Sequence, residues 1–174
     1  QYNVPEGWYS TDPNDPYKRI NELRQLIDEI HHAGMRVTMD VVYNHVYDNK
    51  TFPFDKLVPG YYFRYDERGM LTNVSGCGND VASEKRMAHK FILDSVRYWV
   101  RNFNLDGFRF DLMGLLDVDT MNEALMIMKN ADPNGIVYGE GWNMPSNIPE
   151  DERANMNNYL LMPNIGFFND KFRD

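Results

Sequence analysis

A repeated order of amphipathic helix followed at once by a short apolar strand is the feature that most constrains the fold of this chain. The first helix is predicted to begin at Pro16, with Asp15 as its N-cap, and to end at Gly34. The apolar run 35–42, rich in β-branched residues, then predicts a strand that is covered on both faces. Helices and strands that alternate in this way predict the parallel sheet of an α/β fold, either open or closed into a barrel.

Two further units repeat this order downstream. A helix with Ser83 as its cap precedes a predicted strand at 105–111. A helix that begins near Thr120 with a capping box precedes a predicted strand at 135–140, and 165–168 is a weaker fourth strand. The apolar stripe of the helix after Ser83 consists of Ala88, Ile92, Val96, Trp99 and Phe103.

The connection 43–82 is too long for a simple loop and is rich in aromatic residues. Long connections of this kind often form lids or binding surfaces, and aromatic rings can stack on sugars. The same rings could instead pack on one another in a compact Ω-loop, and the sequence favours neither reading. The aromatic residues are Tyr43, Tyr47, Phe52, Phe54, Tyr61, Tyr62, Phe63 and Tyr65.

Charge and cysteine content exclude several kinds of partner and scaffold. The net charge is −8, from 26 acidic and 18 basic residues without a Lys/Arg block, so we expect neither nucleic acid nor a membrane as a partner. No apolar run approaches the roughly 20 residues of a membrane span, and 1–11 lacks a signal-peptide pattern. Cys77 is the sole cysteine, which excludes a disulfide framework and leaves cytoplasmic and secreted locations open. Because the chain begins without Met, we expect its natural start elsewhere.

Polar residues close each of the three stronger predicted strands. In parallel α/β folds the ligand site lies outside the carboxyl ends of the strands, so these residues are the candidates for function. The motifs are 40–45 (Asp-Val-Val-Tyr-Asn-His), 107–111 (Gly-Phe-Arg-Phe-Asp) and 138–142 (Tyr-Gly-Glu-Gly-Trp). Side-chain alternation along the second strand turns Phe108 and Phe110 to one face and the charged residues to the other.

Asp111 and Glu140 are the two carboxylates whose predicted surroundings differ. Arg109, two residues from Asp111, would hold that carboxylate ionised, which suits a nucleophile. Trp142 would place an apolar wall beside Glu140 and favour its protonated form, which suits a proton donor. Glycoside hydrolysis needs such a pair, and a separation of about 5 Å makes the reaction retaining through a covalent intermediate.

Each of these residues also has a simpler interpretation when it is taken alone. Asp111 could be a helix cap or a loop acceptor, and His45 is weak evidence by itself. His31 and His32 are adjacent on a helix and point to different faces, so we interpret them as solvated residues and predict no metal site. Only the joint arrangement at strand ends favours catalysis.

Three of these motifs resemble the short conserved regions of the α-amylase family, glycoside hydrolase family 13. The motif 40–45 is similar to the first region, 107–111 to the second, and Glu140 within 138–142 to the third. The resemblance covers almost the whole chain. Within the family, the subgroup that the chain resembles most is the type I pullulanases, on the motifs at 2–7, 77–80, 112–114, 139–142 and 168–170.

This resemblance implies that residues 1–174 are part of one catalytic (β/α)8 barrel domain, from the loop after strand two to just past strand six, with the rest of the barrel outside the chain. It implies that Asp111 is the nucleophile and Glu140 the acid/base. Asp40 would support the site, and Asn44 would brace the loop or lie near a calcium ion where one exists; no cofactor is required. The implied substrate-binding residues are His45, Arg109, Tyr43, Trp142, Asn79 and Asp80.

The resemblance implies hydrolysis of α-1,6 branch points in pullulan, amylopectin or limit dextrins by a retaining double displacement. Residues 112–115 lack the Lys and His that α-amylases usually place after the nucleophile, which favours debranching over α-1,4 cleavage. The family's fourth region, which supplies a third carboxylate, is absent from the sequence. The alternatives are an isoamylase, a branching enzyme, a non-catalytic glucan-binding fragment, or an unrelated α/β protein with chance matches.

Overall fold

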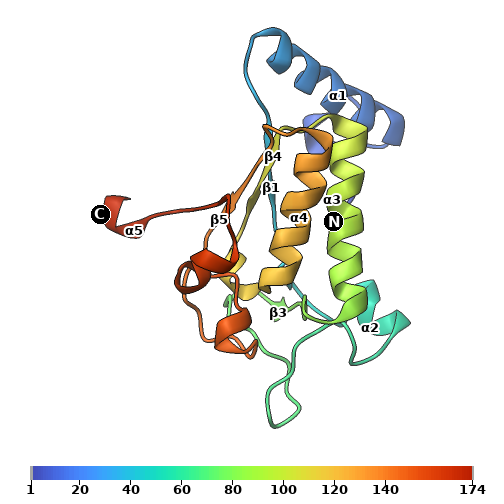
Figure 1. Ribbon diagram of the computed structural model, residues 1–174. Helices are drawn as coiled ribbons and strands as arrows, with labels where there is room; N and C mark the ends of the chain where they lie inside the picture. The colour runs from blue at the N-terminus through green and yellow to red at the C-terminus, as the bar shows by residue number, and fades with distance from the viewer. Residues whose placement is uncertain (1, 174) are drawn as a thin grey trace.

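The computed structural model describes residues 2–173 and shows a mixed α/β fold built on one parallel sheet (Figure 1). The sheet has four strands in the order β1-β4-β5-β6, and every neighbouring pair is parallel. The predicted parallel sheet is therefore confirmed. Its strands are β1 (Thr38–Val41), β4 (Gly107–Phe110), β5 (Ile136–Gly139) and β6 (Ile165–Phe167).

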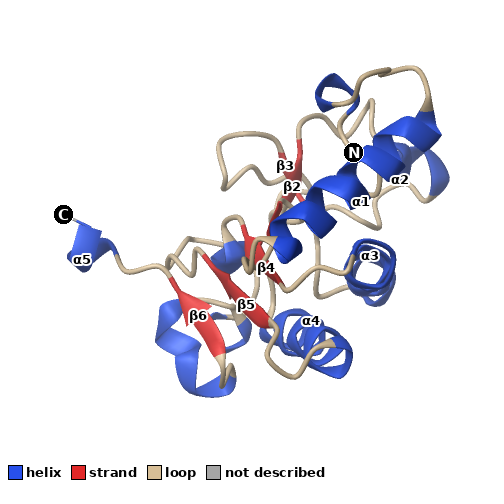
Figure 2. Ribbon diagram, turned by 90° about the horizontal axis from the view of Figure 1, so that it is seen from above, coloured by secondary structure: helices blue, strands red, loops and turns tan. Residues whose placement is uncertain are grey.

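Helices connect consecutive strands of this sheet, and Figure 2 shows α3 and α4 lying side by side against one of its faces. No helix within residues 2–173 has the length and apolar character needed to cross a membrane. The α-helices are α1 (Pro16–His32), α2 (Pro53–Leu57), α3 (Arg86–Phe103), α4 (Val118–Ala131) and α5 (Asp170–Arg173). The 3-10 helices are η1 (Gly7–Tyr9), η2 (Met113–Leu115), η3 (Glu150–Glu152) and η4 (Met156–Leu161). A small antiparallel ribbon pairs β2 (His45–Val46) with β3 (Asn79–Asp80).

The predicted N-terminal caps of the three long helices are right for α1 and wrong for α3 and α4, although α4 begins within two residues of Thr120. The Asp15 carboxylate accepts hydrogen bonds from the first-turn amides of α1, as expected of an N-cap. Ser83 does not cap α3, which begins after Lys85 without a side-chain cap. The Ser83 hydroxyl instead accepts a hydrogen bond from the Asp117 amide at 3.2 Å. Asp117 in turn caps α4 by accepting from the Thr120 amide at 2.8 Å, so the predicted capping box lies inside the helix.

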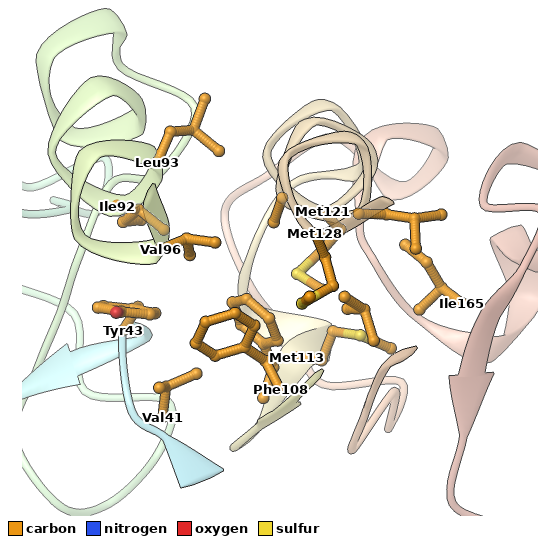
Figure 3. Close-up of a cluster of buried hydrophobic side chains, with 14 of the residues drawn as sticks. Val41, Tyr43, Ile92, Leu93, Val96, Phe108, Met113, Met121, Met128 and Ile165 are labelled. Atoms are coloured by element: carbon orange, nitrogen blue, oxygen red, sulfur yellow. The ribbon is translucent and has the colours of Figure 1, made fainter. Parts of the chain in front are cut away.

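The main core fills the space between the sheet and the helices α3 and α4 (Figure 3). Phe108 and Phe110 of β4 are both fully buried in it, as the alternation of the strand predicts. The predicted stripe of α3 also faces this side, because Val96 and Phe103 are buried. Burial of these aromatic and aliphatic side chains is the main force that holds the helices on the sheet.

The opposite face of the sheet is much less covered, which corrects the prediction for the first strand. Asp40 of β1 has a side chain that is 63% exposed, and Ile136 of β5 is 44% exposed. Only Thr38–Val41 of the predicted 35–42 pairs as a strand, and Met35 is exposed at its predicted start. The apolar character of 35–42 reflects the face of the strand that packs on the core. The face that carries Asp40 is open among the residues described.

The aromatic residues of 43–82 mostly pack on one another. Phe54 stacks on Tyr62 with a centroid distance of 4.3 Å, and Phe63 is fully buried in the same second core. Tyr47, which is 90% exposed, is the exception. Of the two alternatives left open by the sequence, self-packing therefore describes most of these rings.

A polar network closes the amino-terminal end of the sheet, opposite the strand ends that carry the candidate residues. The Asp106 carboxylate accepts from the Val37 amide at 2.6 Å and contacts His31 Nε2 at 2.8 Å. Burial alone would raise the pKa of Asp106, but these contacts and nearby Arg36 lower it overall. His31 is thus a half-buried partner of Asp106, and its interpretation as a solvated residue was wrong.

Candidate active site

The parallel register brings the carboxyl ends of β1, β4 and β5 side by side. Asp40 lies opposite Arg109 in the ladder, and Arg109 lies opposite Tyr138. The ladder continues one residue further, since the Asp111 amide donates to Val41 at 2.9 Å and the Glu140 amide donates to Phe110 at 3.1 Å. The backbone therefore fixes Asp111 and Glu140 as neighbours at one edge of the sheet.

One guanidinium, that of Arg109, contacts three carboxylates at this edge. Its Nη1 lies 2.9 Å from Asp40 Oδ1 and 3.1 Å from Asp111 Oδ1. Its Nη2 lies 2.7 Å from Glu140 Oε1. Burial alone would lower the pKa of Arg109, but the hydrogen bonds to Asp40 and Asp111 and the charge of Glu140 raise it overall. The guanidinium is thus a fixed cation between the two proposed catalytic carboxylates.

The predicted difference in surroundings between Asp111 and Glu140 is wrong for Glu140. Glu140 does not lie in an apolar setting, because Arg109 contacts one carboxylate oxygen and the Leu112 amide donates to the other at 3.1 Å. Trp142 is half-buried two residues further along the chain. Glu140 and Asp111 thus both accept charge-assisted hydrogen bonds from Arg109, and their surroundings are more alike than the sequence predicts.

Asn44 and His45 approach Asp111 from the end of β1. The buried Asn44 amide donates to the Asp111 carbonyl at 2.7 Å and to its Oδ2 at 3.0 Å. Asn44 Oδ1 lies 2.5 Å from His45 Nδ1, so the ring donates from Nδ1 and, when neutral, presents Nε2 as an acceptor. The structure brings both predicted residues to the site, Asn44 as a brace of the carboxylate.

Two predicted substrate-binding residues are instead buried in the protein. Tyr43 is 2% exposed, and its hydroxyl pairs with Ser95 Oγ at 2.6 Å. Burial raises the pKa of Tyr43 to about 12, although the Ser95 hydrogen bond opposes this shift. Asp80 is fully buried and accepts from the Val74 amide at 3.1 Å and 3.2 Å. Neither side chain presents a surface to a sugar, so the predicted direct contacts are wrong for both.

Asn79 and Asp80 contribute to the site through the backbone. They form β3, in which Asp80 lies opposite His45 in the antiparallel ribbon. The Asn79 side chain accepts from the Asn49 amide at 3.0 Å and so ties the ribbon to the following turn. The ribbon thereby holds the segment that carries His45.

Leu112 and Phe168 contact the site but were not singled out as site residues by the sequence. Leu112 follows Asp111 with φ +39°, a left-handed conformation that a leucine seldom adopts, and this conformation accompanies the amide contact to Glu140. The ring of Phe168 lies 5.6 Å from the Arg109 guanidinium carbon. A signal existed for Phe168, since it closes the predicted strand 165–168, whereas a left-handed leucine has no sequence signature.

No group of three His, Cys, Asp or Glu side chains within residues 2–173 is arranged to hold a metal ion. The ionisable side chains that the described residues bring together at this end of the parallel sheet are carboxylates, an imidazole and a guanidinium. Paired carboxylates at adjacent ends of parallel strands are an arrangement that glycoside hydrolases of α/β fold use.

Comparisons with known proteins show what the chain is similar to. No family model matches the chain. It is 51% identical over 171 residues to the pullulanase of Bacillus subtilis (strain 168), a match that covers 98% of this chain and 24% of the relative. The crystal structure of a pullulanase from Anoxybacillus sp. LM18-11 complexed with maltotetraose superposes with a TM-score of 0.98 at 51% identity, covering 100% of this chain and 26% of that one.

A second crystal structure, of the type I pullulanase from Bacillus subtilis str. 168 complexed with maltose, superposes with a TM-score of 0.94 at 49% identity. That match covers 99% of this chain and 25% of the other. The chain is thus homologous to type I pullulanases over its whole length and spans about a quarter of the length of the relatives it matches.

Proposed function

We propose that the full-length protein containing this chain hydrolyses α-1,6 branch points in pullulan, amylopectin or limit dextrins with retention of configuration. The single observation that carries the proposal is the position of Arg109 between Asp111 and Glu140 at adjacent strand ends, in a chain 51% identical to a pullulanase. The α-glucan as partner is supported by the solved relatives, which are complexed with maltose and maltotetraose.

Asp111 is the proposed nucleophile and Glu140 the proposed acid/base. An Asp111 oxygen bonds to the anomeric carbon while Glu140 gives its proton to the departing glucosyl oxygen, and the glycosidic bond breaks. Water then attacks the same carbon, gives a proton to Glu140 and releases Asp111. The acid step requires a proton on Glu140, whose Oε1 lies 2.7 Å from Arg109 Nη2.

The neighbouring residues have supporting roles in this proposal. Asn44 holds the second oxygen of Asp111 and leaves the orientation of the nucleophile fixed. His45 offers Nε2 to a sugar hydroxyl, and Trp142 offers a half-buried ring after Glu140. Asp40 supports Arg109 through its 2.9 Å contact.

We also propose that the parallel sheet is part of a (β/α)8 barrel, within one catalytic domain that includes residues 1–174. The supporting observations are the parallel order β1-β4-β5-β6, the helices on one face, and the exposure of Asp40 and Ile136 on the other. In a barrel the open face would become the packed interior. The third carboxylate that the resemblance implies would come from elsewhere in the full-length protein.

Substitution of the two carboxylates in the full-length enzyme tests the proposed roles. Asp111→Asn and Glu140→Gln should each lower turnover of pullulan by several orders of magnitude, roughly 10⁴-fold or more, without loss of the thermal unfolding transition. Asp28→Asn, on the exposed side of α1, is the matched control and should leave turnover unchanged. A fluorinated α-glucosyl donor should label Asp111, and label on Glu140 would exchange the two roles.

Product analysis tests the substrate class. Maltotriose released from pullulan supports α-1,6 cleavage, because pullulan is built of maltotriose units joined by that bond. Activity confined to glycogen or amylose would move the assignment to another enzyme of the family. Binding of branched dextrin without release of reducing sugar would contradict catalysis itself.

A further inference from the structure

We propose that Arg64 is a positioning residue, which acts through the turn that follows Asp111 to hold Glu140 in place for proton transfer. This inference rests on the proposed function. Arg64 lies in the long connection 43–82, and its side chain bonds to groups other than the two carboxylates of the site. It is 4% exposed, so its position needs an explanation, because a buried charge is costly unless it is paired and hydrogen-bonded.

One side of the Arg64 guanidinium is neutralised within its own region of the chain. Glu84, just before α3, accepts from Nε at 3.3 Å and from Nη2 at 2.7 Å, a bidentate pairing. Nη2 also donates to the Val81 carbonyl at 3.0 Å. These contacts satisfy the charge and fix the plane of the guanidinium.

The other side of the guanidinium joins the two loops that follow the catalytic strands. Nη1 donates to the Leu115 carbonyl at 3.3 Å, in η2, the turn that comes after Asp111. It also lies 3.4 Å from Ser146 Oγ, in the loop that comes after Glu140. A single buried group thus connects the segments behind both proposed catalytic residues.

The turn η2 transmits this connection directly to Glu140. At its start the Leu112 amide donates to Glu140 Oε2 at 3.1 Å, and the Gly114 amide donates to the Glu140 carbonyl at 3.1 Å. The turn also packs tightly, because a Cβ on Gly114 would lie 2.1 Å from the Trp142 carbonyl oxygen. A shift of η2 would therefore move the groups that orient the Glu140 carboxylate.

Asp111 depends less on this turn than Glu140 does. Its backbone is in the sheet ladder with Val41, and its carboxylate is held by Arg109 and Asn44. Loss of the Arg64 contacts should accordingly impair proton donation by Glu140 more than nucleophilic attack by Asp111. A purely structural role of Arg64 would reduce both in proportion to the fraction of folded enzyme.

The experiment compares two substrates in the full-length enzyme. Cleavage of pullulan needs a proton on the leaving oxygen, whereas fluoride leaves an α-maltotriosyl fluoride with little help from an acid. The quantity is kcat/KM, which reports only steps up to bond cleavage and so excludes the later base role of Glu140. The variant Arg64→Lys keeps a charge beside Glu84 but cannot also bridge Leu115 and Ser146.

We expect Arg64→Lys to lower kcat/KM for pullulan roughly ten- to a hundredfold, and for the fluoride by less than about threefold. Arg101→Lys, on the exposed side of α3, should alter neither value. Ser146→Ala removes the Arg64 contact together with the hydrogen bond that Ser146 Oγ accepts from the Ile148 amide at 3.2 Å. It should show the same selectivity at about two- to fivefold for pullulan, which decides the question if Arg64→Lys fails to fold.

Equal losses on both substrates, or no loss in either variant, would overturn the positioning role. Glu140→Gln is the reference that separates this inference from the proposed function. If Glu140→Gln lowers kcat/KM equally for both substrates, Glu140 is not the acid and the proposed function has failed. If Glu140→Gln lowers kcat/KM mainly for pullulan, whereas Arg64→Lys and Ser146→Ala do not, only the inference about Arg64 has failed.

Discussion

Replacement of Arg109 by lysine perturbs the centre of the candidate site while it keeps the positive charge. The guanidinium contacts Asp111 through Nη1 and Glu140 through Nη2, so the two carboxylates are held by different nitrogens of one planar group. An ammonium is a single point charge and can keep only one of these contacts in good geometry. The other carboxylate would then lose its orientation beside the sugar.

The size of the effect follows from the contacts that are lost. The Asp40 pair contributes little, about 0–1 kcal/mol, because that carboxylate is 63% exposed. A hydrogen bond to a less exposed charged group contributes about 1.5–3 kcal/mol, so losing one, together with the orientation of the other, should raise the barrier by about 2–3 kcal/mol. That corresponds to a loss of roughly 30- to 150-fold in kcat/KM.

The assay is release of reducing sugar from pullulan by the full-length enzyme, with thermal unfolding measured on the same samples. Arg101→Lys, an exposed change of the same kind, should leave both quantities unchanged. Activity of Arg109→Lys within about threefold of the parent would refute the bridging argument, since the predicted loss is at least tenfold larger. Activity lost only in parallel with unfolding would refute it as well.

Three further predictions concern the turn, the far end of the sheet and the chain by itself. Gly114→Ala should lower kcat/KM on pullulan by more than about tenfold and lower the melting temperature, because its Cβ would lie 2.1 Å from the Trp142 carbonyl; parental values for both would show that the turn adapts. The pKa of Asp106 is lowered in the fold, so its stabilisation is present above about pH 4 and lost as the pH falls through the folded value. Asp106→Asn should therefore lower the free energy of unfolding by about 1–2 kcal/mol at pH 7. The difference in free energy of unfolding between variant and parent should become smaller as the pH is lowered, and a difference that stays constant with pH would exclude the carboxylate as its cause. Residues 1–174 expressed alone should hydrolyse pullulan no faster than buffer and should aggregate or lack a sharp thermal transition, since β1 and β6 are sheet edges and one face is open; robust turnover would contradict this.

The architecture could be predicted from the sequence where one strong pattern decides it. The stripe of α3 and the alternation around Phe108 and Phe110 correctly indicate which faces are buried. The carboxyl-end rule correctly brings Asp111, Glu140 and Arg109 together, because parallel register leaves little freedom in the position of a strand end.

Several details could not be predicted because they depend on partners distant in sequence. Ser83 has the residue type of a helix cap, but the Asp117 amide, 34 residues away, uses its hydroxyl. The prediction of an apolar setting for Glu140 was wrong because it was based on Trp142, a neighbour in sequence. The groups that contact the Glu140 carboxylate are Arg109 and the Leu112 amide. Tertiary contacts that override local preference in this way leave no periodic signal in the sequence.

The two arginines show how a sheet edge becomes a defined site. Strand register fixes where the backbones of Asp111 and Glu140 lie, but it does not fix where their carboxylates point. Direction has to come from the groups that contact the carboxylates, and Arg109, on β4, supplies it by contacting both of them. Arg64 would orient the Glu140 carboxylate indirectly, through the backbone of the turn at 112–115. Because the two routes differ, substitutions at Arg109 should disturb both halves of the reaction, whereas substitutions at Arg64 should disturb mainly the half that needs a proton.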